Sequence, residues 1–201
     1  MRRIAGLVLL SWAVTANAAE PRRQIGQVDG QPVYADQIVG DTRQARADSA
    51  SEVFMAPMLR QWMREHTAAS RPTEAEKQSA EKAIAEYAAC SGNGYALPEA
   101  AGQKDAVLVM LIGNVKLQKQ LYDAYGGGRL LFQQAGVEAF DATRRMLEAR
   151  EAGGRFAITD PEARALAYDY WTRDHGAFMI TDPAKIADAL DVTSLIARCP
   201  A

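Results

Sequence analysis

The sequence predicts a mainly α-helical protein, a single helical domain of about six or seven helices with a small N-terminal β-hairpin. Apolar residues recur at helical spacing along most of the chain after residue 50, and several of these segments begin with a capping residue. Near the N-terminus, Asp29-Gly30 separates two short segments and is a dipeptide that tight hairpin turns prefer. A length of 201 residues is enough for one domain with a hydrophobic core.

The first 18 residues are expected to be a secretory signal peptide. Arg2 and Arg3 precede an apolar run over residues 4–14, and the triplet Ala16-Asn17-Ala18 is typical of a cleavage site. A membrane anchor is the alternative, but the run is about half of the roughly 20 residues that a span needs. We therefore expect a secreted protein, with the periplasm as its compartment and residues 19–201 as its single helical domain.

The remaining chain carries 21 basic and 25 acidic residues, without a block of basic residues. Nucleic acid and anionic membranes are therefore not expected as partners, because both bind clustered positive charge. Stable insertion into a membrane is not expected either.

Residues 24–34 predict the hairpin, with Pro32 placing the second strand at the edge of its sheet. Residues 35–50 predict a short helix and a connection. Thr73 and Glu76 form a capping box that begins a helix ending near residue 89.

The helix expected at the centre of the core spans residues 104–125. Its first half, residues 106–112, is apolar on every face, a pattern typical of a buried helix. Its second half is amphipathic and is expected to leave the core toward solvent. Three consecutive glycines, residues 126–128, then end it.

The C-terminal part, residues 129–201, is expected to be helical. Residues 130–132 are apolar and predict either a buried extended segment or one helical turn, and helices are predicted over residues 137–152, 161–174 and 183–197. A short repeat relates residues 154–161 to residues 176–183, each copy ending in Thr-Asp-Pro, a good helix start. Duplication and chance reuse of that start explain the repeat equally well.

A stripe of apolar side chains on the helix predicted over residues 51–66 is the candidate binding surface. Three methionines and a tryptophan in it could repack around different apolar peptides. The more ordinary interpretation is that the stripe faces the core. The candidate peptide-binding residues are Phe54, Met55, Met58, Trp62 and Met63.

Cys90 and Cys199 are the two cysteines, and an exported chain with an even count usually pairs them. We expect an intramolecular disulfide between them, with two buried free thiols as the alternative. A catalytic thiol is disfavoured, because neither cysteine lies beside a histidine or in a C-x-x-C pair.

The motifs of common catalytic, cofactor and metal sites do not occur in the sequence. His66 and His175 are the only histidines; each is expected to lie exposed near a helix end, and neither has a zinc-like spacing from the cysteines. The sequence therefore identifies no catalytic residue, no cofactor-binding residue and no metal ligand, and an enzyme is not expected.

Residues 24–128 resemble the N-terminal helical region of the SurA and PpiC type of periplasmic chaperones and parvulin prolyl isomerases. The resemblance rests on V-D-G-Q-P-V, on R-P-T-E-A-E at a helix start, and on a long helix ending in L-Y-D-A-Y-G-G. It implies helices that bind unfolded exported proteins. No parvulin domain follows, so isomerase activity is not implied.

The expected function is therefore a non-catalytic, chaperone-like protein of the periplasm that binds extended apolar segments of unfolded exported polypeptides. The alternative is a dedicated partner-binding protein, such as an immunity or assembly factor for one exported protein.

Overall fold

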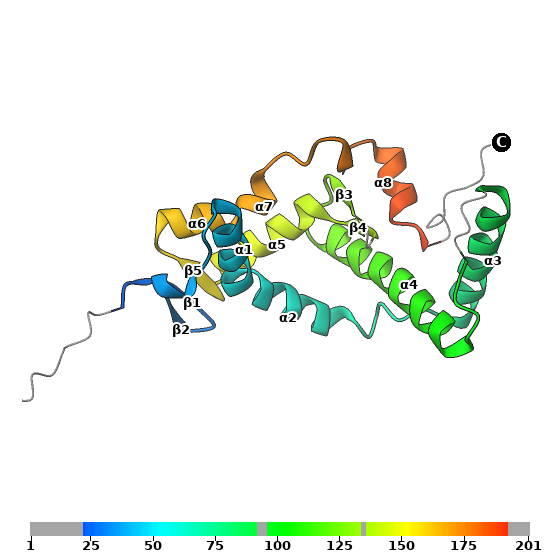
Figure 1. Cartoon of the computed structure of the whole chain (residues 1–201), viewed down its shortest axis with the longest axis horizontal. Coiled ribbons are helices and arrows are strands. Elements are labelled where there is room, and N and C mark those ends of the chain that lie inside the picture. Colours follow the sequence, from blue (N-terminus) through cyan, green and yellow to red (C-terminus); the bar gives the residue numbers. More distant parts are fainter. Residues whose placement is uncertain (1–21, 92–95, 134–135, 193–201) are drawn as a thin grey trace, which may run out of the picture.

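A computed structural model describes residues 22–91, 96–133 and 136–192 of the chain. Within these residues the chain forms eight α-helices and two three-stranded antiparallel sheets (Figure 1). The prediction of a mainly α-helical fold is confirmed. The prediction of a single small hairpin is wrong, because four further strands form.

The first sheet contains the predicted hairpin, β1 (Gln24–Val28) and β2 (Gln31–Tyr34), followed by the short 3-10 helix η1 (Ala35–Gln37). Asp29 and Gly30 both have positive φ, 48° and 78°, as the turn requires. The strand order is β2-β1-β5, so β2 with its Pro32 is an edge strand as predicted. The third strand, β5 (Phe156–Ile158), comes from far along the chain.

The second sheet has the order β4-β3-β6 and is built from β3 (Leu130–Gln133), β4 (Gly136–Glu138) and β6 (Met179–Ile180). The apolar residues 130–132 therefore form an extended segment, which was one of the two predicted outcomes. Leu130 and Leu131 are buried in it.

The internal repeat accounts for β5 and β6. In each copy a short strand is followed by a helix that begins with proline. The aspartate before the proline caps the helix by accepting a hydrogen bond from a backbone N–H group, Asp160 from Ala163 (2.9 Å) and Asp182 from Ala184 (2.8 Å). The two strands join different sheets, because β5 pairs with β1 and β6 with β3. In the first copy Phe156 and Ile158 are buried in the core, whereas in the second copy Ile180 packs against the core and Phe178 is 64 % exposed.

Two of the helices predicted in the C-terminal part are shorter than expected. The segment over residues 161–174 divides at Tyr168 into α6 (Pro161–Ala167) and α7 (Asp169–Thr172). After the 3-10 helix η2 (Gly176–Phe178) and β6, α8 (Pro183–Ala189) is two turns long. The remainder of the predicted helix, residues 193–197, lies outside the described residues.

Helices α1 (Arg43–Phe54) and α2 (Ala56–His66) meet at Met55, and Pro57 lies in the first turn of α2. Proline is tolerated there because the backbone N–H at that position has no partner within the helix. The predicted helix over residues 51–66 is therefore two helices.

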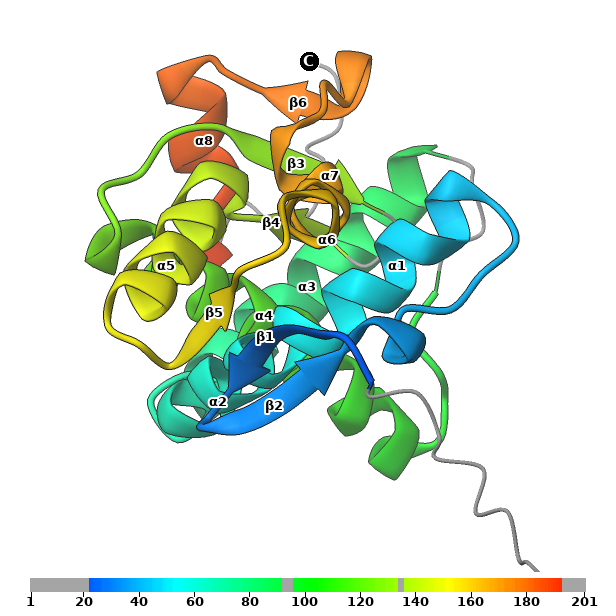
Figure 2. The same cartoon turned by 90° about the vertical axis from the view of Figure 1, so that its left-hand side faces the viewer.

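The core is centred on α5 (Phe140–Ala152), not on the helix that the sequence predicted to be central. Five residues of α5 are almost fully buried, Phe140, Ala142, Thr143, Met146 and Leu147. Helix α5 packs against α4, α7, β3 and β5, and in the view of Figure 2 it lies to the left, with the first sheet below it and to its right.

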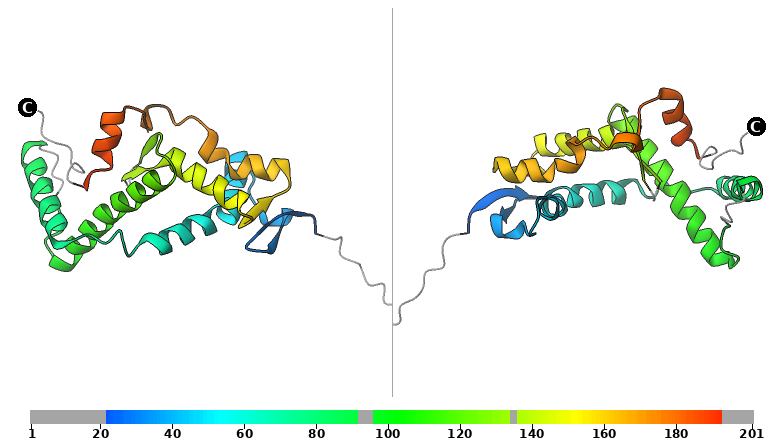
Figure 3. Two further views of the ribbon diagram at one scale, coloured as in Figure 1. Left: turned by 180° about the vertical axis from the view of Figure 1, so that it is seen from behind. Right: turned by 45° about the horizontal axis from the view of Figure 1, so that its top comes forward.

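Helix α4 (Ala101–Ala124) follows the predicted range closely, but its burial is the reverse of the prediction. Its C-terminal half packs in the main core through Val115 and Leu121. In the described residues its N-terminal half packs mainly against α3 (Glu74–Ser91), where Leu108 and Ile112 form a separate small cluster with Ala80 and Ile84, and Leu97 and Val192 pack against this cluster. In the left view of Figure 3, α3 and the N-terminal part of α4 lie at the end of the molecule away from the first sheet. One covering helix leaves part of the apolar surface of α4 exposed.

Candidate functional site

The predicted peptide-binding stripe on α1 and α2 divides into two rows of side chains. Phe54, Met58 and Trp62, spaced four residues apart, are all buried in the core. Exposure increases along the neighbouring row: Met55 is buried, Leu59 is half-buried and Met63 is 50 % exposed. The row leaves the core because α2 extends beyond the elements that cover it.

Peptide binding by Phe54, Met55, Met58 and Trp62 was therefore a wrong assignment, and the core interpretation of the stripe is confirmed for these four. Their side chains are occupied by intramolecular packing; Trp62, for example, lies edge-on to Tyr125, with ring centroids 5.5 Å apart. Met63 alone presents an accessible surface.

Met63 lies on the wall of a groove between the C-terminal part of α2 and the middle of α4, which we call the α2–α4 groove. The groove has a volume of about 350 Å³. Its lining comprises Met63, Thr67, Ser70, Arg71 and Pro72 on one side and Val109, Met110, Gly113, Asn114 and Leu117 on the other.

Exposed apolar side chains are concentrated in the α2–α4 groove. Of the six large hydrophobic residues that are exposed in the described part of the chain, three line it: Met63, Val109 (40 % exposed) and Met110 (61 %). Such a cluster is unusual on a protein surface and commonly marks an interaction site.

Ser70, the buried polar residue in the wall of the groove, has its hydrogen bonds satisfied. The Ser70 hydroxyl donates to the carbonyl of His66 (3.0 Å) and accepts a bond from the amide of Gln120 (2.8 Å). The His66 ring stacks on Trp62, with centroids 3.4 Å apart, so this histidine is partly buried rather than exposed as predicted. An apolar ligand could therefore cover the wall without leaving Ser70 unpaired.

The sequence did not identify Val109, Met110 or Pro72 as candidate site residues. The signal was present, because residues 106–112 are apolar on every face. That pattern has two physical outcomes, a helix covered on all sides or a helix with apolar surface left over, and the prediction considered only the first.

A cavity of about 920 Å³ lies between α4, α8 and the segment that follows the triple glycine. Three basic residues line it, and each is paired with a carboxylate. The pairs are Lys116 with Glu76 (3.0 Å), Lys119 with Asp123 (2.7 Å) and Arg129 with Asp141 (2.9 Å). Burial acts to raise the pKa of Asp141, but the bonds from Arg129 outweigh it and lower that pKa. The cavity therefore presents charges of both signs, already neutralised.

Glu138 is a partly buried carboxylate between β4 and α7. Burial raises its pKa, although the hydroxyl of Tyr170 and the amide of Gln133 each donate to its Oε2 at 2.6 Å. The His175 ring lies edge-on to Tyr170, with centroids 4.8 Å apart, so this histidine is also partly buried. These contacts join β3, β4 and α7, which is a structural role.

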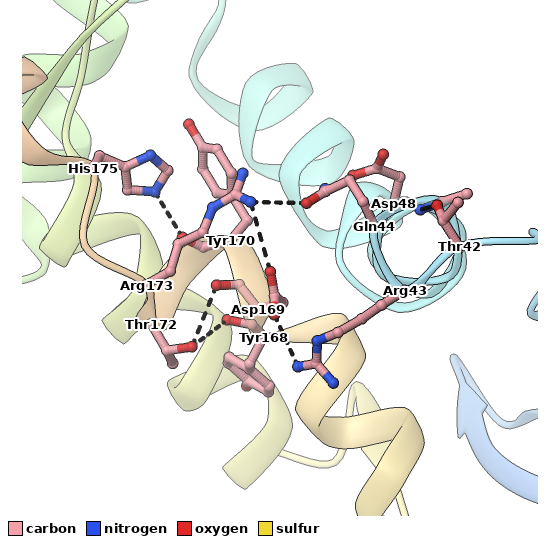
Figure 4. Close-up of polar contacts among 11 residues, drawn as sticks. Thr42, Arg43, Gln44, Asp48, Tyr168, Asp169, Tyr170, Thr172, Arg173 and His175 are labelled. Carbon is pink, nitrogen blue, oxygen red and sulfur yellow. Dashed lines mark hydrogen bonds and ion pairs between the residues drawn. The ribbon is translucent and has the colours of Figure 1, made fainter.

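A second polar cluster joins α7 to α1 (Figure 4). Arg43 on α1 bonds to Asp169 (3.0 Å), and Arg173 bonds to Gln44 of α1 (2.9 Å). Because the two arginines and Gln44 are exposed, we interpret the cluster as surface pairing that aligns the two helices.

In the described ranges no group of three or more His, Cys, Asp or Glu side chains could hold a metal ion. No helix of residues 22–91, 96–133 or 136–192 is both long enough and apolar enough to cross a membrane. Cys90 lies in the last turn of α3, whereas Cys199 lies outside the described residues, so their pairing stays a prediction.

Comparison of the chain with family models, curated proteins and solved structures finds no match.

Proposed function

We propose that this protein is a non-catalytic, chaperone-like protein of the periplasm that binds extended apolar segments of exported polypeptides in the α2–α4 groove. The observation that carries the proposal is the exposure of Met63, Val109 and Met110 along one groove. The export signal over residues 1–18 supports the compartment.

The chemistry of the groove suits varied apolar sequences. Met63 on α2 and Met110 on α4 both line it, with unbranched, polarizable side chains that can adapt to ligands of different shape. Gly113 has no side chain, and α4 lies close to the Ser70 backbone there, because a Cβ at this position would be 3.6 Å from the Ser70 carbonyl oxygen. Broad rather than sequence-specific binding is the expected result.

Binding to any one segment should be weak, about micromolar. The groove is short, and an extended ligand loses conformational freedom when it is ordered on the surface. Weak and broad binding is appropriate for a protein that must release its ligands without an energy source.

The test is suppression of aggregation, measured by light scattering, of reduced and denatured lysozyme, an exported protein. The purified protein should slow the aggregation at a few-fold molar excess. Met110→Glu should abolish the effect, because a carboxylate in the groove disfavours apolar ligands.

Val39→Glu is the matched control, because Val39 is similarly exposed, at 63 %, and does not line the groove. Both variants should keep the wild-type circular dichroism spectrum and melting temperature. Equal loss of activity in the two variants, or no suppression by the wild-type protein, would contradict the proposal.

Crosslinking in the native compartment then separates this function from a dedicated partner-binding protein. Many captured polypeptides that Met110→Glu releases support a chaperone. A single captured protein would instead identify an assembly or immunity factor.

A further inference from the structure

We infer that the α2–α4 groove selects apolar segments that carry an acidic side chain, and that Arg71 is the residue that makes this selection. The inference rests on the proposed function and specifies the ligand class for the same site.

The charge of the groove wall is the first observation. Of its ten lining residues, Arg71 is the only one with an ionisable side chain, and all the others are apolar or neutral polar residues. The groove therefore presents one positive charge and no negative charge to a ligand.

The second observation is that Arg71 is exposed and has no carboxylate within ion-pair distance in the part of the chain that the structure describes. Its neighbour Lys116 donates to the Arg71 carbonyl (3.1 Å) and is itself held by both carboxylate oxygens of Glu76 (3.0 Å each). Glu76 is thus engaged by a different cation, and the guanidinium of Arg71 stays available for a ligand.

The length of the groove limits the ligand. The lining residues of α4 run from Val109 to Leu117, about 12 Å at roughly 1.5 Å per helical residue. An extended segment advances about 3.3 Å per residue, so the groove holds about four residues. Arg71 and Pro72 line the groove and are separated from the end of α2 by residues 67–70, so a carboxylate must come from within or next to this short apolar stretch to reach the guanidinium.

A planar guanidinium binds a carboxylate through two parallel N–H bonds, which fixes direction as well as charge. The acidic group we assign is a side chain of the bound segment rather than a C-terminal carboxylate, because a chaperone for unfolded chains meets internal segments far more often than chain ends.

The experiment measures the binding of three fluorescent nine-residue peptides by anisotropy. Each peptide is acetylated and amidated and has four consecutive apolar residues followed by Glu, Gln or Lys. We expect the Glu peptide to bind about two- to five-fold more tightly than the Lys peptide at low salt, the range of an exposed ion pair. In about 0.5 M salt the difference should disappear.

Arg71→Glu should reverse the order of the three peptides. Arg64→Glu is the matched control, because Arg64 is also exposed and its charge change is the same, but it lines a different pocket and not the groove. This control should keep the wild-type order.

The possible failures are distinguishable. If the three peptides bind equally and Met110→Glu abolishes all binding, the groove binds apolar segments and the inference about Arg71 is overturned. If no peptide binds, the inference fails together with the proposed function. If a free C-terminal carboxylate on the Gln peptide raises affinity more than the Glu side chain does, the assignment to an internal acidic residue is overturned.

Discussion

Replacing Met58 and Met63 separately by alanine compares two positions on one helix that differ in burial. Met58 is fully buried and Met63 is 50 % exposed. Both lie within α2, so the small gain in helix propensity from methionine to alanine is common to the two variants and cancels in the comparison.

The expected losses follow from burial. Removing the Met58 side chain leaves a cavity in the core next to Phe54 and Trp62, and buried Met→Ala changes cost about 2–5 kcal/mol. Met63 loses about half of a side chain's contacts and leaves no enclosed cavity, so its cost should be below about 1 kcal/mol. At about 2–4 °C per kcal/mol for a chain of this size, a 3 kcal/mol loss lowers the melting temperature by about 6–12 °C.

Urea unfolding followed by far-ultraviolet circular dichroism gives both free energies, and an unchanged m-value shows that the compactness of the two end states is preserved. Equal losses at the two positions, or a larger loss for Met63→Ala, would refute the division of the stripe into a buried and an open row. The assignment of the groove would then be wrong as well.

Two further predictions concern redox state and pH. Mass measurement after alkylation without reductant should show no modified thiol, because Cys90 and Cys199 are expected to be paired, and two alkylated thiols would exclude the pairing. Closing a loop of this length contributes about 4–5 kcal/mol to the free energy of unfolding, so Cys199→Ser should lower the melting temperature. Burial raises the pKa of Glu138, so the folded protein keeps a proton on this carboxyl group that the unfolded chain releases above about pH 4.3. The free energy of unfolding should therefore fall as the pH rises from that value through the raised pKa. Glu138→Gln keeps an oxygen that can accept from Tyr170, so it should remove this fall in pH-dependent melting experiments; an unchanged pH profile would show that Glu138 titrates normally.

The sequence by itself determined the features that depend on neighbouring residues. The turn at Asp29 and Gly30 follows from positive φ, which few residues tolerate, and the start of α3 follows from the reciprocal bonds of Thr73 and Glu76. These features need no information about distant parts of the chain.

The additional strands depended on pairing between distant segments. Residues 156–158 become a strand only because β1 offers an open edge, and β6 depends on β3 in the same way. Three-residue and two-residue strands are too short to carry a periodic signal, so the sequence could predict the caps that follow them but not the strands themselves.

The candidate site was decided by the tertiary structure for a related reason. A sequence shows which side chains are apolar and which of them share a helix face, but burial requires a second element to cover that face. Around Met58 and Trp62 the rest of the main core supplies the cover. Near Val109 and Met110, α3 packs against the face of α4 that carries Leu108 and Ile112, and the apolar surface left over in the described residues lines the α2–α4 groove.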